Sequence, residues 1–371
     1  MSTFKTISEN TQYWFIRAGR DSGKFFYNFK ENGVVALGHA EDVVLPIFHD
    51  NALSDEEKEM VLISTQTALQ NREESKSQIS NKVNQIRRFI EIMKPGDIVI
   101  TINDTSIMTG QVTSGVYFGS VGLTSNTERD KGSNDTCYFN LRCNVNWGRI
   151  KNRSLLPSDI EKIFRYTGSI LQLDKPEQIK SINHWLYPIH FVEDEVRCTL
   201  KISSKEELSN RQLTKLSGVL DELELLADYL SNEIDNNGAI SHDKYLTYAT
   251  EYRDSYTYTL KAQHQFMSPG HQFLQLDGSE TKKVIFAILL QLTLSSEVTG
   301  ASLDDVVPEG VDLQMIESIV QSVNGSNDVA VIKASLDVGL SKPSVPVEEI
   351  SEAEHNIDDG WGSEPSENSA L

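Results

Sequence analysis

The chain has 371 residues, more than one compact domain usually contains, so its length predicts two globular units, each able to bury a core. Hydrophobic residues make up 39% and charged residues 24% of the chain, which excludes collagen-like, wholly disordered and disulfide-scaffold classes. Cys137, Cys143 and Cys198 lack the paired spacing of a zinc site, and the most apolar window, residues 284–294, is about half the length of a membrane span. We therefore expect a cytoplasmic protein without a membrane segment.

The formal net charge of −20 is distributed unevenly along the chain. Residues 1–190 contain 22 Lys and Arg and 22 Asp and Glu, so the whole acidic excess lies in residues 191–371. Nucleic acids are bound through summed Lys and Arg contacts to phosphates. Nucleic-acid binding is therefore expected of the first half only, and the two halves are expected to do different jobs.

The first half alternates strand and helix patterns. Ser54 and Glu57 form a capping-box pattern at the start of a helical region, and the sequence Lys94-Pro95-Gly96-Asp97 ends that region. A polar loop is expected at residues 125–135. The predicted strands span residues 12–16, 33–37, 98–102, 109–118 and 138–145, and the predicted helices span 25–30, 54–93 and 159–164. This order indicates an α+β domain with a small curved sheet or barrel and flanking helices.

The second half is predicted to be a further α+β domain. The connection between the units is placed near residues 182–192. The predicted strands span 196–203, 256–266 and 329–333, and the predicted helices span 209–232, 281–294 and 312–323. Residues 343–371 contain 8 Asp and Glu and neither Lys nor Arg, which predicts a disordered acidic tail. The predicted organisation is thus a first domain at 1–185, an acidic domain at 190–340 and the tail at 343–371.

A series of short motifs in the first half resembles the PUA-like superfamily, in the subgroup found in modification-dependent (type IV) restriction and phage-defence proteins, with EVE and YTH domains as relatives. The resemblance covers about residues 10–175. Its motifs are Tyr13–Gly19 (YWFIRAG), Asn32–His39 (NGVVALGH), Lys94–Ile100 (KPGDIVI), Thr109–Val112 (TGQV), Tyr117–Phe118, Arg142–Trp147 (RCNVNW) and Arg153–Leu156 (RSLL).

The resemblance implies a small β-barrel with flanking helices and, as in several members, an aromatic pocket for a flipped, modified base. Such a base needs an aromatic face for stacking and a few hydrogen bonds to its polar edge. His39 stands where relatives commonly have an aromatic residue. The candidate pocket aromatics are Trp14, Tyr27, Tyr117 and Trp147, and the candidate polar readers or phosphate contacts are Arg17, His39 and Arg142. The competing interpretation is a core position for each aromatic residue and a solvated side chain for each polar one.

Catalytic motifs are not readable in this sequence. It has no GxxxxGK[ST] phosphate loop, no HExxH and no restriction-nuclease Asp followed by ExK on a convincing hairpin. The acidic run Asp221–Glu224 lies in an amphipathic helical pattern, where a solvated face explains it. We expect no catalytic residue, no metal site and no cofactor.

The preferred hypothesis is a sensor in anti-phage defence. Its first domain recognises a modified base in nucleic acid, DNA rather than RNA, and its acidic domain contacts a protein partner or self-associates. A partner then supplies the catalytic effector. Three alternatives stay open: a divergent modification-dependent nuclease, a PUA-like RNA-binding module and a structural adaptor with a closed pocket.

Overall fold

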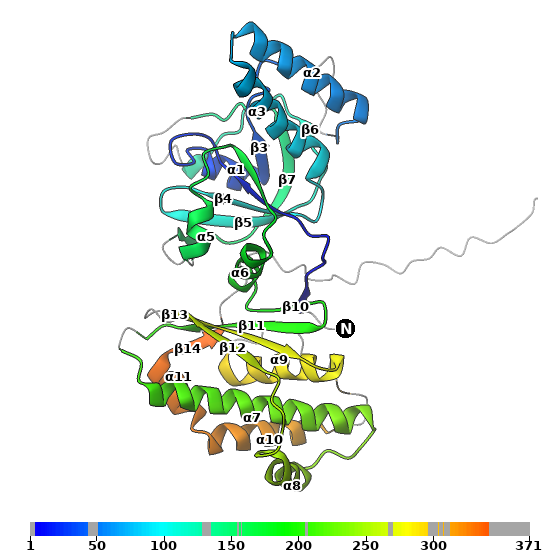
Figure 1. The fold of residues 1–371 in the computed structure, drawn as a ribbon, viewed down its shortest axis with the longest axis vertical. Coiled ribbons are helices and arrows are strands. Elements are labelled where there is room, and N and C mark those ends of the chain that lie inside the picture. The colour runs from blue at the N-terminus through cyan, green and yellow to red at the C-terminus, as the bar shows by residue number, and fades with distance from the viewer. Residues whose placement is uncertain are drawn as a thin grey trace, which may run out of the picture.

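The computed structural model describes residues 4–43, 51–127, 135–153, 156, 158–204, 207–265, 270–295, 303, 307 and 312–340. The predicted tail at 343–371 lies outside these residues, as does most of the predicted loop at 125–135. Helices and sheets are mixed throughout (Figure 1), so the predicted α+β class is confirmed.

The first sheet is curled into a half-barrel with the strand order β3-β7-β5-β4-β2-β9, to which β6 and β8 are added beside β7 and β5. No hydrogen-bonded pair joins β3 to β9 among the described residues, so the curl stays open there. The strands are β2 (Tyr13–Ile16), β3 (Val34–Leu37), β4 (Ile98–Ile102), β5 (Ser106–Val112), β6 (Tyr117–Phe118), β7 (Leu141–Trp147), β8 (Lys151–Asn152) and β9 (Ile170–Leu173).

Helices cover both faces of this sheet, which explains why its central strands are buried on both sides. In β2, Trp14 and Ile16 pack into one core while Tyr13 and Phe15 pack into another. The predicted capping box at Ser54 is confirmed. The helices are α1 (Phe26–Asn32), α2 (Asp55–Asn71), α3 (Lys76–Arg87), the π-helical turn η1 (Arg88–Ile92), α5 (Ser158–Ile163) and α6 (Pro176–Leu186).

The second sheet includes the beginning of the described chain. Its order is β1-β10-β11-β13-β12, with β14 also paired to β11. Strand β1 pairs in parallel with β10, so the chain runs through the second sheet before it enters the first. The strands are β1 (Lys5–Thr6), β10 (Ile189–Val192), β11 (Glu195–Ile202), β12 (Lys261–Gln265), β13 (Gly270–Asp277) and β14 (Val338–Leu340).

Helices α7 and α9 pack together against one face of the second sheet, with α8, α10 and α11 around them (Figure 1). The strand predicted at residues 329–333 is wrong, because this short apolar run lies in helix α11. The segment at 182–192, where the connection was predicted, is formed by the end of α6 and by β10. The helices are α7 (Asn210–Asp235), α8 (His242–Tyr252), α9 (Glu280–Leu294), α10 (Leu313–Ser326) and α11 (Val329–Leu336).

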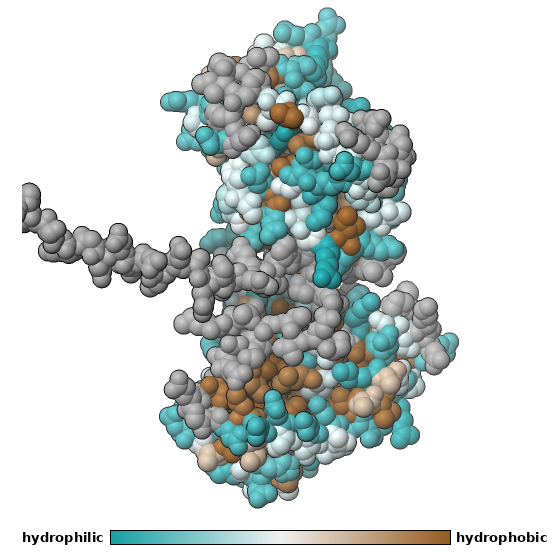
Figure 2. Space-filling model, turned by 180° about the vertical axis from the view of Figure 1, so that it is seen from behind, coloured by the Kyte–Doolittle hydropathy of each residue, from teal (hydrophilic) through white to brown (hydrophobic). Residues whose placement is uncertain are grey.

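Helix α6 lies between the two sheets (Figure 1). Its Ile182 and Leu186 belong to the core beneath the first sheet, and its His184 bonds Thr199 on β11 at 3.0 Å. We call the part built on the first sheet the first unit and the part built on the second sheet the second unit. In the view of Figure 2, hydrophobic residues gather on the second unit, whereas the first unit is mainly hydrophilic. None of the described helices has both the length and the apolar character of a membrane-spanning helix.

Candidate functional site

A cavity of about 690 Å³ opens where β2 and β3 end. We call it the β2–β3 cavity. Its wall comes from the loop after β2, the residues after β3, one side of α3 and the turn before β9. The main lining residues are Arg17, Gly19, Arg20, Lys24, Phe25, His39, Glu41, Arg72, Gln78, Asn81, Lys82, Gln85, Phe139 and Ser169.

Two glycines allow the loop after β2 to fold tightly against the sheet. Gly19 has φ of +85°, and a Cβ atom there would lie 2.6 Å from Cδ2 of Phe25. Gly23 has φ of +80°, and a Cβ atom there would lie 2.2 Å from the carbonyl oxygen of Ile102. Both positions therefore require glycine for conformation and for space. The loop brings Arg17, Arg20 and Phe25 to one cavity.

His39 follows β3 with φ of +82°, a conformation that non-glycine residues rarely adopt. Its Nε2 lies 3.3 Å from the hydroxyl oxygen of Ser169, so a side-chain contact bridges the open side of the half-barrel. Burial lowers the pKa of His39, and the nearby Glu41 carboxylate opposes that shift. The imidazole is therefore neutral near pH 7, with one nitrogen able to donate and one able to accept. A strained residue held in a cavity wall is a common feature of functional sites.

The cationic side chains around the cavity differ in how they are paired. Three of them meet a carboxylate: Lys24 with Asp135 at 3.4 Å, Lys82 with Glu74 at 2.5 Å, and Arg72 with Asp42. The Arg17 guanidinium donates instead to the carbonyl of Tyr166, and its Nε has no hydrogen-bond partner within the described chain. Arg20 is exposed and forms no ion pair with any carboxylate in the described ranges. Among the described residues, Arg17 and Arg20 are thus the cavity cations whose charge no carboxylate neutralises.

Two phenylalanines give the cavity an aromatic surface. The rings of Phe25 and Phe139 meet edge to face, with centroids 5.3 Å apart and an interplanar angle of 83°. Phe25 is buried, whereas Phe139 is half-buried on the segment that leads into β7. Phe139 is therefore the ring that a ligand in this cavity can reach more easily.

One side of α3 presents amide side chains to the same cavity. Gln78, Asn81 and Gln85 are separated by three and four residues, so they share one helix face. The side-chain oxygen of Gln85 accepts a hydrogen bond from the backbone N–H of Ser169 at 2.7 Å. Gln78 takes part in the capping box that starts α3. Asn81 is exposed. Amides with donors and acceptors side by side suit the polar edge of a heterocyclic base.

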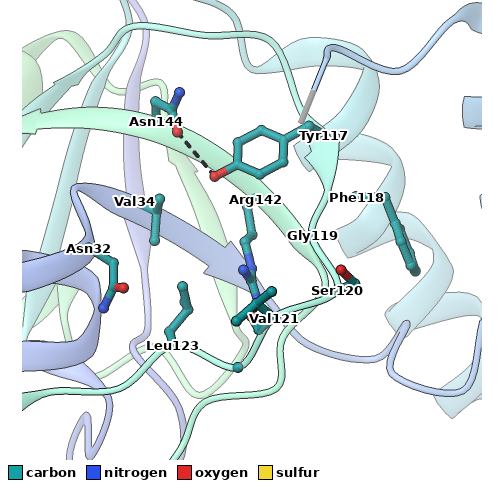
Figure 3. A pocket seen from close by; sticks show the side chains of 11 residues that line it. Asn32, Val34, Tyr117, Phe118, Gly119, Ser120, Val121, Leu123, Arg142 and Asn144 are labelled. Atoms are coloured by element: carbon teal, nitrogen blue, oxygen red, sulfur yellow. Dashed lines mark hydrogen bonds between the residues drawn. The ribbon is translucent and has the colours of Figure 1, made fainter. Parts of the chain in front are cut away.

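A second cavity, of about 490 Å³, lies beside β7 and contains Tyr117 and Arg142. We call it the β7 cavity. Figure 3 shows the Tyr117 ring directed toward Asn144, whose side-chain oxygen accepts the Tyr117 hydroxyl at 3.1 Å. The Arg142 guanidinium donates to the carbonyls of Phe139 at 2.8 Å and Val121 at 2.6 Å. This buried arginine therefore fastens neighbouring loops to β7.

The remaining predicted aromatics do not line either cavity. Trp14 is fully buried and donates from its indole N–H to the Asp97 carboxylate at 2.8 Å. Trp147 is buried too and donates to the carbonyl of Val34 at 3.2 Å. Tyr27 is half-buried and packs against the same core. Trp14 and Trp147 thus belong to the core, which corrects the assignment of both to a pocket wall.

The seven predicted site residues are therefore separated in space. Arg17 and His39 meet in the β2–β3 cavity, and Tyr117 and Arg142 meet in the β7 cavity. Sequence reasoning missed Arg20, Phe139 and the amide face of α3. The only available signal for Arg20 was its place in the turn-rich Arg20–Gly23 segment beside Arg17.

Within the residues that the structure describes, no group of three His, Cys, Asp or Glu side chains is arranged to hold a metal ion. Comparison of the chain with family models, curated proteins and solved structures gives no match.

Proposed function

We propose that the first unit is a nucleic-acid reader that holds one extruded, modified base in the β2–β3 cavity. The observation that carries the proposal is the meeting of Arg17, Arg20, His39 and Phe139 in one cavity, although they come from separate segments. The motifs that resemble PUA-like domains support it through Arg17, which lies in the first of them, whereas His39 departs from the pattern of the relatives.

Each part of the cavity suits one part of a nucleotide. The half-buried Phe139 ring offers an apolar face to a base, and base–aromatic stacking contributes about 1–3 kcal/mol. The neutral His39 imidazole and the amides of Asn81 and Gln85 offer hydrogen bonds to the polar edge of the base. Arg20 lies at the exposed rim, where a phosphate of the same strand remains solvated.

The size of the cavity is consistent with this use. Ligand pockets commonly enclose about 300–1,000 Å³, and the 690 Å³ here fall within that range. Extruding a base from a duplex costs a few kcal/mol, and a single strand avoids part of that cost. Single-stranded probes therefore give the clearest first test.

The decisive experiment compares labelled 12-nucleotide DNA strands that are identical except for one central base. The bases are cytosine, 5-methylcytosine, 5-hydroxymethylcytosine, adenine and N6-methyladenine, with one unmodified RNA strand of the same sequence. Fluorescence anisotropy should show tighter binding to at least one modified strand than to its unmodified partner. Tighter binding to the RNA strand would instead favour the RNA-binding alternative.

Phe139→Ala provides the variant that locates the base. We expect it to weaken binding to the preferred strand about tenfold, because stacking on the ring is lost. Tyr138→Ala is the matched control, since Tyr138 is adjacent in sequence, 65% exposed and outside both cavities. Equal binding by the wild type and Phe139→Ala, with both proteins folded, would show that the base does not bind in this cavity.

A further inference from the structure

The second sheet has a polar face, which is turned toward α6. On β11, Val196, Cys198, Leu200 and Ile202 pack into the core of the second unit. Because side chains alternate along a strand, Glu195, Arg197, Thr199 and Lys201 lie on the other face. Their partners on β13 are Asp277, Gln275, Phe273 and His271, in that order. Four cross-strand pairs therefore line the side that α6 covers.

Helix α6 follows these pairs in register. Lys180 donates to the side chain of Gln275 at 3.1 Å, and one turn later the His184 ring packs against Phe273, tilted by 41°, with ring centroids 4.7 Å apart. Four helical residues advance about 6 Å and two strand residues about 6.6 Å, so side chains four residues apart on α6 lie opposite side chains two residues apart on the strand. The next pair along the strands, Lys201 and His271, thus lies by the C-terminal end of α6.

A further cation from the first unit, Lys151, reaches the same end of α6, and the exposed Arg149 precedes it by two residues. The Nζ atom of Lys151 on β8 lies over the ring of Trp185 at 5.3 Å from its centroid. The pKa of Lys151 is lowered to about 8, mainly by burial and in addition by the nearby charges of Lys201 and Arg149. Burial also lowers the pKa of His271, with Lys201 and Lys151 adding to the shift. We call Arg149, Lys151, Lys201 and His271 the junction cluster.

The opposite end of the polar face is neutralised within the protein. Glu195 pairs with Arg197 at 2.9 Å, and Asp277 pairs with Lys261 at 2.8 Å. Arg149 and Lys201, by contrast, form no ion pair with any carboxylate in the described part of the chain. Positive charge thus gathers at one end of a face that belongs to the acidic half of the molecule. An anionic ligand would complement this end.

Lys151 of the junction cluster is connected through neighbouring strands to the loop after β2, which forms part of the wall of the β2–β3 cavity. Gly23 in the cavity loop touches the backbone of Ile102, Ile102 pairs with Ile107 across β4 and β5, and Ile107 pairs with Lys151 on β8. Three neighbouring backbone spacings amount to roughly 15 Å. A few nucleotides of a single strand span such a distance.

We propose that the junction cluster binds phosphates of the strand whose base occupies the β2–β3 cavity. The inference rests on the proposed function and extends it, because it adds a second contact region at the junction of the two units. Cavity contacts select the base, and contacts at the junction cluster hold the backbone without regard to sequence. The second unit then takes a direct part in nucleic-acid binding, through a cationic end of its sheet.

The test measures how binding depends on salt for the double variant Arg149→Gln/Lys201→Gln. Both side chains are at least partly exposed, so the fold should tolerate the change. The probes are the 12-nucleotide strands with cytosine and with the preferred modified base. Each lost phosphate contact reduces the slope of log K against log salt by about 0.7 on a single strand. We expect the slope to fall by about 1.4 and binding at 0.1 M salt to weaken about 25-fold, equally for both strands.

Lys261→Gln is the matched control, because Lys261 lies on the same sheet but at the neutralised end. It should leave the slope unchanged. An unchanged slope in the double variant, with base discrimination intact, overturns the junction cluster and leaves the proposed function standing. A reduced slope in the double variant, together with a wild-type protein that does not discriminate between the bases, overturns the cavity reader instead. If the wild type binds neither strand, both proposals are overturned.

Discussion

The β2–β3 cavity and the polar network between α7 and α9 both concentrate charged and hydrogen-bonding side chains, yet they differ in what those groups already contact. In the network, Lys282 donates to Glu224 at 3.0 Å and to the Tyr256 hydroxyl at 2.7 Å, and Glu224 also accepts the backbone N–H of Thr259 at 2.9 Å. Glu224 is fully buried, so the solvated face expected for the acidic run at 221–224 is wrong at this residue, which an ion pair holds in the core. In the cavity, Arg20 and Asn81 are exposed, and neither has such a set of partners among the described residues. The polar groups of the network bind one another, whereas Arg20 and Asn81 in the cavity are available to bind a ligand.

This contrast gives a practical criterion for recognising a site. A dense polar cluster whose groups satisfy one another stabilises the fold, and a cluster with unused donors and acceptors in a concave surface can bind a ligand. Substitutions in a self-satisfied polar cluster should lower stability and leave ligand binding intact. Substitutions in a cluster with unused donors and acceptors should weaken ligand binding and leave stability intact.

The largest effect is expected for Glu224→Leu, which leaves the buried Lys282 ammonium without its main partner. Removing one member of a buried ion pair costs about 3–5 kcal/mol, so the free energy of unfolding should fall by that amount in urea denaturation. Base discrimination by the folded protein should not change. Lys261→Gln, in an exposed pair, should leave the urea midpoint where it is. A small loss with Glu224→Leu would contradict the description of the network as a structural unit.

Arg142→Met extends the same comparison to the first unit. The buried guanidinium donates to two loop carbonyls, and hydrogen bonds of charged groups contribute about 1.5–3 kcal/mol each. We expect a loss of about 2–3 kcal/mol in unfolding free energy and an unchanged salt slope of binding. Arg165→Met, at an exposed position outside both cavities, is the control. A reduced salt slope would show that Arg142 contacts nucleic acid and does not act only in the structure.

The buried histidines between α6 and the second sheet predict a pH dependence. Burial lowers the pKa of His184 to about 2 and that of His190 to about 3. In the unfolded chain both take up a proton below about pH 6.5 while the folded chain does not, so stability is lost as the pH falls below that value. Each histidine should cost about 2 kcal/mol at pH 5. Thermal or urea unfolding at pH 7 and pH 5 measures this loss, and His184→Gln should remove about half of it. Equal pH dependence in the variant would show that His184 is protonated in the folded protein.

The elements that could be predicted from the sequence are those whose burial leaves a periodic pattern. Strands β3, β4 and β11 and helices α7 and α9 lie where their patterns placed them, give or take a few residues. Strand β1 has only two residues, and its partner β10 lies about 185 residues away, so no local pattern reveals it. The apolar run at 329–333 suits a strand and a buried helix equally well, and packing decided in favour of the helix.

The site was predictable in part for a similar reason. Arg17 directly follows β2 and precedes Gly19 by two residues, and His39 directly follows Gly38 after the end of β3, so both lie where the chain turns and side chains reach the rim. Trp14 sits in a strand that is covered on both faces, and the sequence does not distinguish a residue facing a core from one facing a pocket. Phe139 reaches the cavity only because β7 pairs with β3, a contact between residues about 100 positions apart. The local sequence around Phe139 carries no sign of it.

The smallest effect is expected for Arg20→Gln, which tests whether the free cation at the cavity rim contacts phosphate. Since Arg20 is exposed and has no carboxylate partner in the described chain, its loss should leave the midpoint of urea unfolding unchanged. One phosphate contact on a single strand contributes about 0.7 to the salt slope, so the slope should fall by that amount for modified and unmodified strands alike. Arg17→Gln should behave differently, because the Arg17 guanidinium also holds the carbonyl of Tyr166 and its loss should lower stability as well. If Arg20→Gln instead reduced the preference for the modified base and left the slope intact, Arg20 would be a reader of the base edge. Base selection would then extend to the cavity rim, where only phosphate contacts are proposed.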